Sequence, residues 1–359
     1  MKEAGQNTSI VDESTAADAR AEAQRIAFGP VLFQACQAMR RIGLLDAMAK
    51  ARRDGATEAD LIAGCGLTSY GFRVLIDMAL TANVAWQRGD RYGLTKTGHM
   101  LATDEMTRVN LDFVDDVCYK GLVHLEEAVR TGTPAGLREH GSWPTVYQGL
   151  AHLPTAFRKS WFEFDNYYSD RSYPEALNIV FRDKPRVIMD VGANNGKWSL
   201  ACLRHDPDVR MIAVDLPGQL RDLERNITQA GMSARVTTHA ADMLDSASIL
   251  PAGADAIWMS QFLDCFSEDE VVAILQKAKA ALSAEASLWI METFIDHQRF
   301  TAAEFSLAAT SLYFTAIANG NSRMYRAEHF EPLVKRAGLR IVERMVDVGL
   351  GHSLLRCMR

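Results

Sequence analysis

The sequence has 359 residues, of which 48% are hydrophobic and 23% are charged. This is the composition of an ordinary globular protein, and the length is sufficient for two domains. The net charge of −6 comes without a long basic run, which argues against nucleic acid as a partner. No apolar run approaches the ~18 residues of a membrane span, and residues 1–24 lack the apolar core of a signal peptide. The six cysteines show no metal-like spacing, so we expect reduced thiols, no bound metal and a cytoplasmic location.

The first part of the chain is predicted to be helical after a flexible arm at residues 1–20. From residue 29 to residue 50, apolar side chains recur every three or four positions and cover more than one side of a helix. A helix of this kind is buried in a core or against a second subunit. The pattern therefore predicts a homodimer formed through the N-terminal domain.

Residues 57–102 are predicted to form a winged-helix unit. Thr57 can cap a short helix that Gly66 ends, and a second helix, an alternating hairpin and a third short helix follow. Winged helices often bind DNA, but the second helix here carries a single cation, Arg73, among apolar residues. We therefore interpret the unit as a packing and dimerisation module rather than a DNA-binding one.

Residues 105–182 look mostly helical, and beyond Arg182 strands alternate with helices. Seven strands are expected, at residues 186–191, 211–215, 235–240, 256–260, 286–292, 340–346 and 353–358. Five strand–helix alternations followed by two closely spaced strands indicate a doubly wound α/β sheet whose last strand is a hairpin partner. The expected domains are therefore a helical and winged-helix domain with a lid at residues 21–182 and a Rossmann-like domain at residues 183–359.

The loop after the first of these strands carries the pattern Asp-x-Gly-x-x-x-Gly, from Asp190 to Gly196. A tight strand-to-helix turn needs glycine where φ is positive or where the backbone approaches a ligand, and Gly192 and Gly196 occupy these places. The spacing differs from the dinucleotide fingerprint, and taken alone the motif is also compatible with a purely structural turn.

Acidic residues at the ends of the next two strands favour a nucleoside ligand. Asp215 ends the second strand, where a carboxylate can accept hydrogen bonds from both ribose hydroxyls. Asp242 follows the third strand and can accept from an adenine amine, while Met243 covers the ring face. Each acid alone is compatible with an ordinary cap, but three matches at successive strand ends favour a binding site.

These residues resemble those of class I S-adenosylmethionine (SAM)-dependent methyltransferases, specifically the plant-type and bacterial small-molecule O-methyltransferases with an N-terminal winged-helix dimerisation domain. The resemblance spans roughly residues 28–359. Its markers are the segments DVGANNG, VDLPG, AADM, FLDCFSEDEVVAIL, FDNYYSDRS and HFEPLVKRAGL. It implies a Rossmann-like seven-stranded methyltransferase domain after a mostly helical dimerisation domain, with SAM as cofactor and S-adenosylhomocysteine (SAH) as product.

The resemblance also implies roles for individual residues. The residues that would bind SAM are Asp190, Gly192, Gly196, Asp215, Leu216, Asp242, Met243, Ser260 and Ser169, and Ser172 would lie near its methionine end. The residues that would line the substrate pocket are Tyr168, Phe164 and Gln261.

The sequence departs from the family at the catalytic base. Asp264 stands where members have the catalytic His, and the Asp-Trp that follows becomes Cys265-Phe266. One supporting acid is present as Glu292, and the other position aligns near Met324. Asp264 could instead cap the helix that follows, although Ser267 with Glu270 fits the capping box better.

Three alternatives follow for the chemistry. In the first, Asp264 is a base with a raised pKa, and the enzyme methylates a hydroxyl on a small aromatic or apolar molecule. In the second, the substrate needs no strong base, as in C- or carboxyl-methylation. In the third, the SAM-binding fold does something other than methylation or acts as a regulator without activity. His124, His140 and His152 are weaker candidates for a replacement base.

Overall fold

The computed structural model describes residues 14–359, which form two compact units. The first ends at Val114 and the second comprises Asp115–Arg359. The arm predicted at residues 1–20 lies largely outside the described residues. Helix α1 (Ala16–Ala27) begins directly after Thr15, whose hydroxyl accepts a hydrogen bond from the Asp18 amide at 3.2 Å. Residues 16–20, which were predicted to belong to the arm, are helical. The cap at Thr15 explains why the helix begins there.

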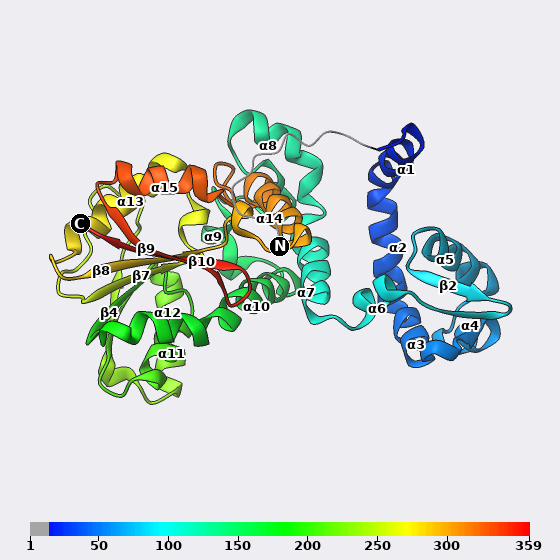
Figure 1. Cartoon of the computed structure of the whole chain (residues 1–359), viewed down its shortest axis with the longest axis horizontal. Helices are drawn as coiled ribbons and strands as arrows, with labels where there is room; N and C mark the ends of the chain where they lie inside the picture. The colour runs from blue at the N-terminus through cyan, green and yellow to red at the C-terminus, as the bar shows by residue number, and fades with distance from the viewer. Residues whose placement is uncertain (1–13) are drawn as a thin grey trace. The chain divides into compact units, whose positions relative to one another are not determined.

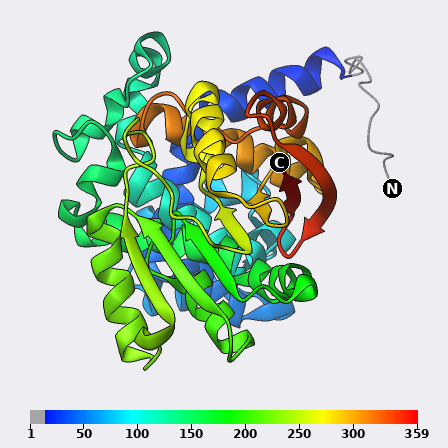
Figure 2. The same ribbon diagram turned by 90° about the vertical axis from the view of Figure 1, so that its left-hand side faces the viewer.

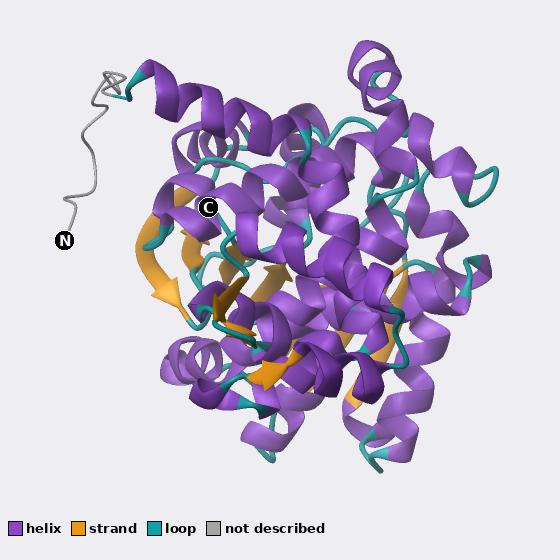
Figure 3. Ribbon diagram, turned by 90° about the vertical axis from the view of Figure 1, so that its right-hand side faces the viewer, coloured by secondary structure: helices purple, strands orange, loops and turns teal. Residues whose placement is uncertain are grey.

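The small unit is mostly helical (Figure 3). Its helices are α1, α2 (Gly29–Ile42), α3 (Leu44–Lys50), α4 (Glu58–Cys65), α5 (Ser69–Thr81), α6 (Lys96–Thr103) and α7 (Glu105–Phe113). Strands β1 (Ala56–Thr57), β2 (Ala85–Arg88) and β3 (Arg91–Leu94) form an antiparallel sheet in the order β1-β3-β2. Thr57 caps α4, and Gly66 ends it with a φ of 64°, so the elements predicted for residues 57–102 are present in the expected order.

The large unit contains a sheet of seven strands (Figure 1). They are β4 (Val187–Val191), β5 (Arg210–Asp215), β6 (Val236–Ala240), β7 (Ala256–Ser260), β8 (Ser287–Glu292), β9 (Arg340–Val348) and β10 (His352–Met358). Their order is β6-β5-β4-β7-β8-β10-β9, in which β10 runs antiparallel to both neighbours. The red C-terminal strands close one edge (Figure 2). This confirms the predicted sheet, including the hairpin of its last two strands.

Helices cover both faces of this sheet (Figure 1). The helices of the large unit are α8 (Leu125–Thr131), α9 (Val146–Gly149), α10 (Thr155–Val180), α11 (Lys197–His205), α12 (Pro217–Gln229), α13 (Glu268–Ala281), α14 (Thr301–Tyr313) and α15 (Ala327–Arg336). Helices α13 and α15 pack on one face, and α10, α11 and α12 pack on the other. The carboxyl ends of all parallel strands lie along one side of the sheet, called here the carboxyl edge. Ligands bind at this edge in open α/β sheets.

The boundary between the units differs from the expected one at residue 182. Helix α10 buries Ala176 and Val180 in the core beneath the sheet, together with side chains of α11 and α12. Nearer its start, the Ser160 hydroxyl donates to Asp116 at 2.6 Å. Residues 115–182 therefore belong with the sheet, because the apolar spacing identifies a helix without showing what its apolar face contacts.

Among the described residues, no single helix is long and apolar enough to cross a membrane. Helices α4 and α5 reach the length and apolar composition of a membrane span only when they are taken together, and they are bent by 112° relative to each other.

Candidate functional site

The loop that follows β4 has the backbone geometry that its glycines predict. Gly192 and Gly196 have φ values of 78° and 83°, and Asn194 between them has a φ of 48°. A Cβ atom at Gly192 would lie 2.4 Å from the Phe262 ring. At Gly196 it would lie 2.8 Å from Leu223. The loop is therefore a close-packed turn that only glycine allows at these two positions.

Asp215 at the end of β5 holds this loop in place. Its carboxylate accepts hydrogen bonds from the amide of Asn194 at 2.7 Å and from the amide of Leu216 at 2.6 Å. Burial raises the pKa of this carboxyl, while the two backbone amides oppose the rise. A carboxylate oxygen can accept more than one hydrogen bond, so both oxygens of Asp215 can also accept from vicinal hydroxyls.

Asp242 and Met243 lie next to Asp215 along the same edge of the sheet. Asp215 pairs with Ala240 across β5 and β6, and its carbonyl accepts from the Ala241 amide at 3.0 Å. The Asp242 side chain is exposed and accepts from the Leu244 amide at 2.9 Å, whereas Met243 is buried. The three residues thus follow one another along the edge, as the strand ends predict.

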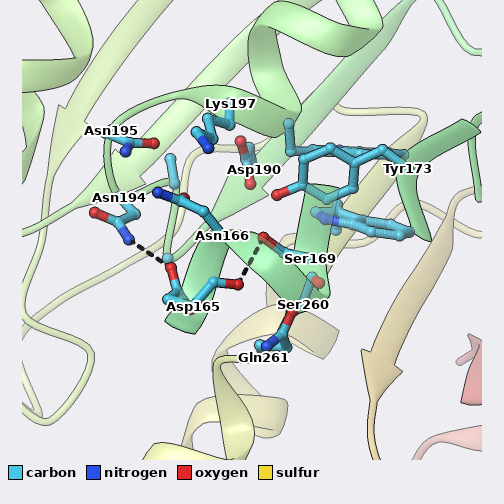
Figure 4. A pocket seen from close by; sticks show the side chains of 14 residues that line it. Asp165, Asn166, Ser169, Tyr173, Asp190, Asn194, Asn195, Lys197, Ser260 and Gln261 are labelled. Atoms are coloured by element: carbon cyan, nitrogen blue, oxygen red, sulfur yellow. Dashed lines mark hydrogen bonds between the residues drawn. The ribbon is translucent and has the colours of Figure 1, made fainter. Parts of the chain in front are cut away.

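A pocket lies beside this row, between the β4 loop, α10 and the end of β7 (Figure 4). It contains about 460 Å³ of empty space, counting the part open to solvent. The predicted cofactor and substrate residues among those that line it are Asp190, Gly192, Ser169, Ser260 and Gln261. The predicted residues outside its lining are Gly196, Asp215, Leu216, Asp242, Met243, Asp264, Glu292, Tyr168 and Phe164.

Buried polar atoms in this pocket lack partners within the part of the chain that the structure describes. They include the Ser260 hydroxyl and the side-chain carbonyl of Gln261, whose φ of 46° is unusual for a residue with a side chain. Asp190 accepts from the Ser199 hydroxyl at 2.7 Å, and burial raises its pKa to about 7. Buried polar groups are normally hydrogen-bonded, so these atoms fit a polar ligand in the pocket.

Further residues that line the pocket were not predicted from the sequence. They are Asp165, Asn166, Tyr173, Ala193, Asn194, Asn195, Lys197, Trp198 and Trp258. Trp198 stacks on Trp258 with ring centroids 3.9 Å apart, and Tyr173 packs edge-on against Trp198. Helical spacing alone could have identified Asp165 and Tyr173, because each lies one turn from the predicted Ser169 on α10.

The predicted substrate residues Phe164 and Tyr168 lie together on α10, with ring centroids 5.2 Å apart. Nearby on the helix, the Trp161 indole donates to the Tyr313 hydroxyl at 2.7 Å. Ser172, which the resemblance would place near the methionine end, is fully buried and bonds instead to His352 at 2.8 Å. Ser172 is not among the residues that line the pocket.

Asp264 and Glu292 lie at the ends of neighbouring strands, β7 and β8. Glu292 is 2% exposed and accepts hydrogen bonds from the amides of Phe262 at 3.1 Å and Leu263 at 2.8 Å. Glu292 therefore anchors the turn that carries Asp264, which is 5% exposed. A second anchor on this turn is Asn319, whose side-chain amide donates to the Cys265 carbonyl.

The carboxyls of Asp264 and Glu292 are coupled, and burial governs the pKa of both. Desolvation raises the pKa of Asp264 to about 7, and a hydrogen bond from the Cys265 thiol at 3.4 Å opposes the rise. Burial and the charge of Asp264 raise the pKa of Glu292 well above its usual range. Burial therefore favours the protonated form of both carboxyls.

Tyrosine side chains lie near the turn that carries Asp264, and no sequence pattern predicted them. The Tyr147 hydroxyl is buried without a partner in the described residues, and the charges of Cys265 and Asp264 add to the burial that raises its pKa. Burial also raises the pKa of Tyr313. The surroundings of Asp264 are thus enclosed and aromatic.

Asp264 does not cap the helix that follows it. Ser267 precedes α13, and its amide and hydroxyl both donate to Glu270, at 2.8 Å and 2.7 Å. The capping box predicted for these two residues is confirmed, which leaves Asp264 for another role. At the position of the second supporting acid, the buried Met324 accepts from the Thr293 hydroxyl at 3.7 Å.

The candidate histidines are placed away from Asp264. His124 pairs with Glu139 at 2.7 Å in a surface network, and the exposed His152 stacks on Trp143. His140 packs edge-on against Phe157, and burial lowers its pKa. No group of three metal-ligating side chains gathers anywhere in residues 14–359.

Two family models match the chain. An O-methyltransferase domain matches residues 175–340, which contain the β4 loop, the pocket residues at the ends of β4 and β7, Asp264 and Glu292. A dimerisation2-like domain matches residues 20–92 in the small unit.

Relatives from Streptomyces lavendulae carry methyltransferase names. An L-tyrosine C(3)-methyltransferase is 23% identical over 87% of this chain and 85% of its own length. O-methyltransferase SfmM3 is 30% identical over 50% of this chain and 53% of its own length.

Solved structures share the fold over almost the whole chain. The SAM-dependent methyltransferase SibL has a TM-score of 0.73 at 23% identity and covers 94% of this chain and 99% of its own. The O-methyltransferase NcsB1, solved with SAM and 2-hydroxy-5-methyl naphthoic acid, has a TM-score of 0.67 at 19% identity and covers 91% of this chain and 95% of its own. The chain thus carries an O-methyltransferase domain over residues 175–340 and a dimerisation2-like domain over residues 20–92, and it is a methyltransferase with SAM as its cofactor.

Proposed function

We propose that SAM lies along the carboxyl edge of the sheet, with its adenosine at the ends of β5 and β6 and its methionine part in the pocket. Asp242 and Met243 then face the adenine and Asp215 accepts from the ribose hydroxyls, with Leu216 beside it. The residues proposed around the methionine part are Asp190, Gly192, Gly196, Ser169 and Ser260. The hydrogen bond from the Asn194 amide supports this arrangement, because it joins Asp215 to the loop between Gly192 and Gly196.

The reaction that fits the site best is methylation of a hydroxyl on a small aromatic molecule, with Asp264 as the general base. SAM supplies an electrophilic methyl group, so the chain has to orient the acceptor and remove its proton. Transfer of a phenol proton to an ordinary aspartate is uphill by ~8 kcal/mol, because the two pKa values differ by about six units. The single observation that carries the proposal is the burial of Asp264, which raises its pKa to about 7.

At that pKa the transfer is uphill by ~4 kcal/mol, similar to the ~5 kcal/mol expected for a histidine of ordinary pKa. Burial thus compensates for the replacement of the family's histidine by Asp264. Glu292 keeps Asp264 in position through the backbone of the turn, and burial together with the charge of Asp264 raises the pKa of Glu292.

The names of several relatives support an aromatic acceptor. One is a 3-hydroxy-5-methyl-1-naphthoate 3-O-methyltransferase from Streptomyces sahachiroi, and another is a phenazine O-methyltransferase from Lysobacter antibioticus. The aromatic side chains of Phe164 and Tyr168 on α10, with Gln261 at the end of β7, form the proposed wall of the acceptor site.

A second candidate is methylation of a ring carbon beside the hydroxyl. It is favoured by the L-tyrosine C(3)-methyltransferase, which aligns with 87% of this chain. Both reactions begin with removal of the phenol proton, so Asp264 has the same role in each.

The test is incubation of the protein with SAM carrying a labelled methyl group and a panel of phenols, naphthols and their fully O-methylated counterparts. We expect label in a methyl ether, identified by mass spectrometry and by its loss on ether cleavage. Label that survives ether cleavage establishes the ring-carbon reaction instead. Transfer to the blocked counterparts at the rate of the free phenols would contradict a mechanism that starts at the hydroxyl.

We further propose that the protein is a homodimer through the small unit. The dimerisation-domain match supports this, as do the apolar side chains of Ile26, Phe28 and Val31, which are 71%, 59% and 57% exposed. Apolar residues this exposed at the start of a helical layer are typical of an interface.

A further inference from the structure

The pocket beside the β4 loop is lined by a cationic side chain, Lys197, and by an acid on a different element, Asp165. Lys197 is the first residue of α11, and Asp165 lies on α10 one turn before Ser169. Both line the pocket, and both side chains are labelled in Figure 4. Because Lys197 lowers the pKa of Asp165 through its charge, the two groups are close enough to act on one ligand.

The Asp165 carboxylate is only weakly paired inside the protein. It accepts a long hydrogen bond of 3.4 Å from the side-chain amide of Asn194. Desolvation raises its pKa to about 6, which shows that the described surroundings do not compensate its charge. The residue is nevertheless only partly buried, and it lines the pocket. A carboxylate in this setting gains from a cation in the pocket.

Asp190, the other acid of the pocket, is less suited to bind a cation. It is 3% exposed and already accepts from the Ser199 hydroxyl at 2.7 Å. Of the two acids, Asp165 is therefore the one whose oxygens face the pocket.

Lys197 is available for an anion. Its amine pairs with Asp170 at 2.6 Å, but the two side chains are 35% and 42% exposed. An ion pair this exposed contributes little to stability, so a carboxylate in the pocket can share the amine.

Asn194 fixes where along the cofactor this pair of charges acts. Its amide donates to Asp215, and its side chain donates to Asp165. Asn194 therefore links Asp165 to Asp215, the residue proposed to bind the ribose. Asp165 lines the pocket with residues at the ends of β4 and β7, which lie on the other side of β5 from β6 and Asp242. In an extended SAM molecule, the part beyond the ribose is the methionine moiety, which ends in an α-ammonium and an α-carboxylate.

We propose that Asp165 binds the α-ammonium of the methionine moiety and Lys197 binds its α-carboxylate, so that the two residues recognise the amino acid end of the cofactor. Methyl transfer removes the sulfonium charge and leaves this end unchanged. SAM and SAH are therefore held equally by the two residues.

The test is isothermal titration calorimetry of the full-length protein with SAM, SAH and 5′-methylthioadenosine, which keeps the adenosine and the thioether but lacks the amino acid. We expect Asp165→Asn to weaken SAM and SAH alike by ~10–100-fold, the effect of one charge-assisted hydrogen bond, and to leave 5′-methylthioadenosine unchanged. Lys197→Met should weaken the same two ligands and again leave 5′-methylthioadenosine unchanged.

Glu163→Gln is the matched control, because it removes the same charge two residues earlier on α10, where Glu163 pairs with Lys159. It should leave all three affinities unchanged. Circular dichroism and thermal unfolding establish that each variant is folded.

Three outcomes overturn the proposal. They are unchanged SAM and SAH affinity in Asp165→Asn, equal weakening of 5′-methylthioadenosine, and weakening of SAM alone, which would place Asp165 at the sulfonium instead. None of these readouts depends on Asp264 or on the methyl acceptor. Failure of this proposal is therefore distinguishable from failure of the proposed reaction.

Discussion

Replacement of Asp264 by Asn tests the proposed base with the smallest change in shape. Asparagine keeps the size of the side chain, but it has no carboxylate to take a proton. Asp264 is 5% exposed, so bulk water cannot take over its role as the proton acceptor. The variant should therefore lose the whole contribution of general-base catalysis to the rate. That contribution is typically ~10²–10⁴-fold, and we expect kcat to fall at least ~100-fold while SAM affinity stays within a few-fold.

The pH dependence of the wild-type rate provides the second part of this test. Burial raises the pKa of Asp264 to about 7, so the carboxyl is protonated and inactive below that pH and ionised above it. The rate should therefore rise with pH, and the enzyme should lose activity as the pH falls through about 7. Initial rates with saturating SAM and a phenolic acceptor, measured from pH 5 to 9, provide the profile.

Asp269→Asn is the control for loss of a carboxylate in the same region. Asp269 lies in the first turn of α13, its side chain is 90% exposed, and it pairs with Arg336. It should leave rate and profile unchanged. Unchanged turnover in Asp264→Asn, or a wild-type acid limb at the ordinary aspartate pKa of about 4, would refute the role of Asp264.

Three further predictions concern the loop, the acid stability and the assembly. Gly192→Ala should lower the unfolding free energy by ~1–3 kcal/mol in denaturant titrations, because its Cβ would lie 2.4 Å from Phe262, whereas Gly231→Ala has the same sign of φ with open space around it and should cost less. Equal costs would contradict the packing argument. Burial lowers the pKa of His352 to about 4, against 6.5 unfolded, so the unfolded chain binds the extra proton first. The contribution of His352 to stability should therefore fall by ~3 kcal/mol as the pH drops from 6.5 to 4. It should appear as a difference in slope between the wild-type protein and His352→Gln over this range, and parallel slopes would count against it. Sedimentation velocity at micromolar concentration should show a dimer, and a monomer alone would exclude the proposed assembly.

The seven strands and the hairpin of the last two were predictable from the sequence, because buried parallel strands carry short, continuous apolar runs. The loop motif and Asp215 were predictable for a related reason, since strand ends are where acids and glycines have a ligand-binding role. The capping box of Ser267 and Glu270 was equally visible, because it depends only on local spacing.

The rest of the site depends on packing between distant segments. Tyr147 and Cys265 are 118 positions apart in the sequence, yet each affects the pKa of the other. The burial that raises the pKa of Asp264 comes from such contacts, and so does the commitment of Ser172 to His352. Periodicity identifies α10 as a helix, but which of its faces meets the pocket is decided by the sheet beneath it.

The most direct test of the central claim is calorimetric titration of the wild-type protein and Asp215→Ala with SAM. Asp215 holds the loop and is placed to accept from the ribose, so we expect one SAM per chain in the wild type and at least ~10-fold weaker binding in the variant. Absence of measurable SAM binding by the wild-type protein, or equal affinity in the two proteins, would contradict the account.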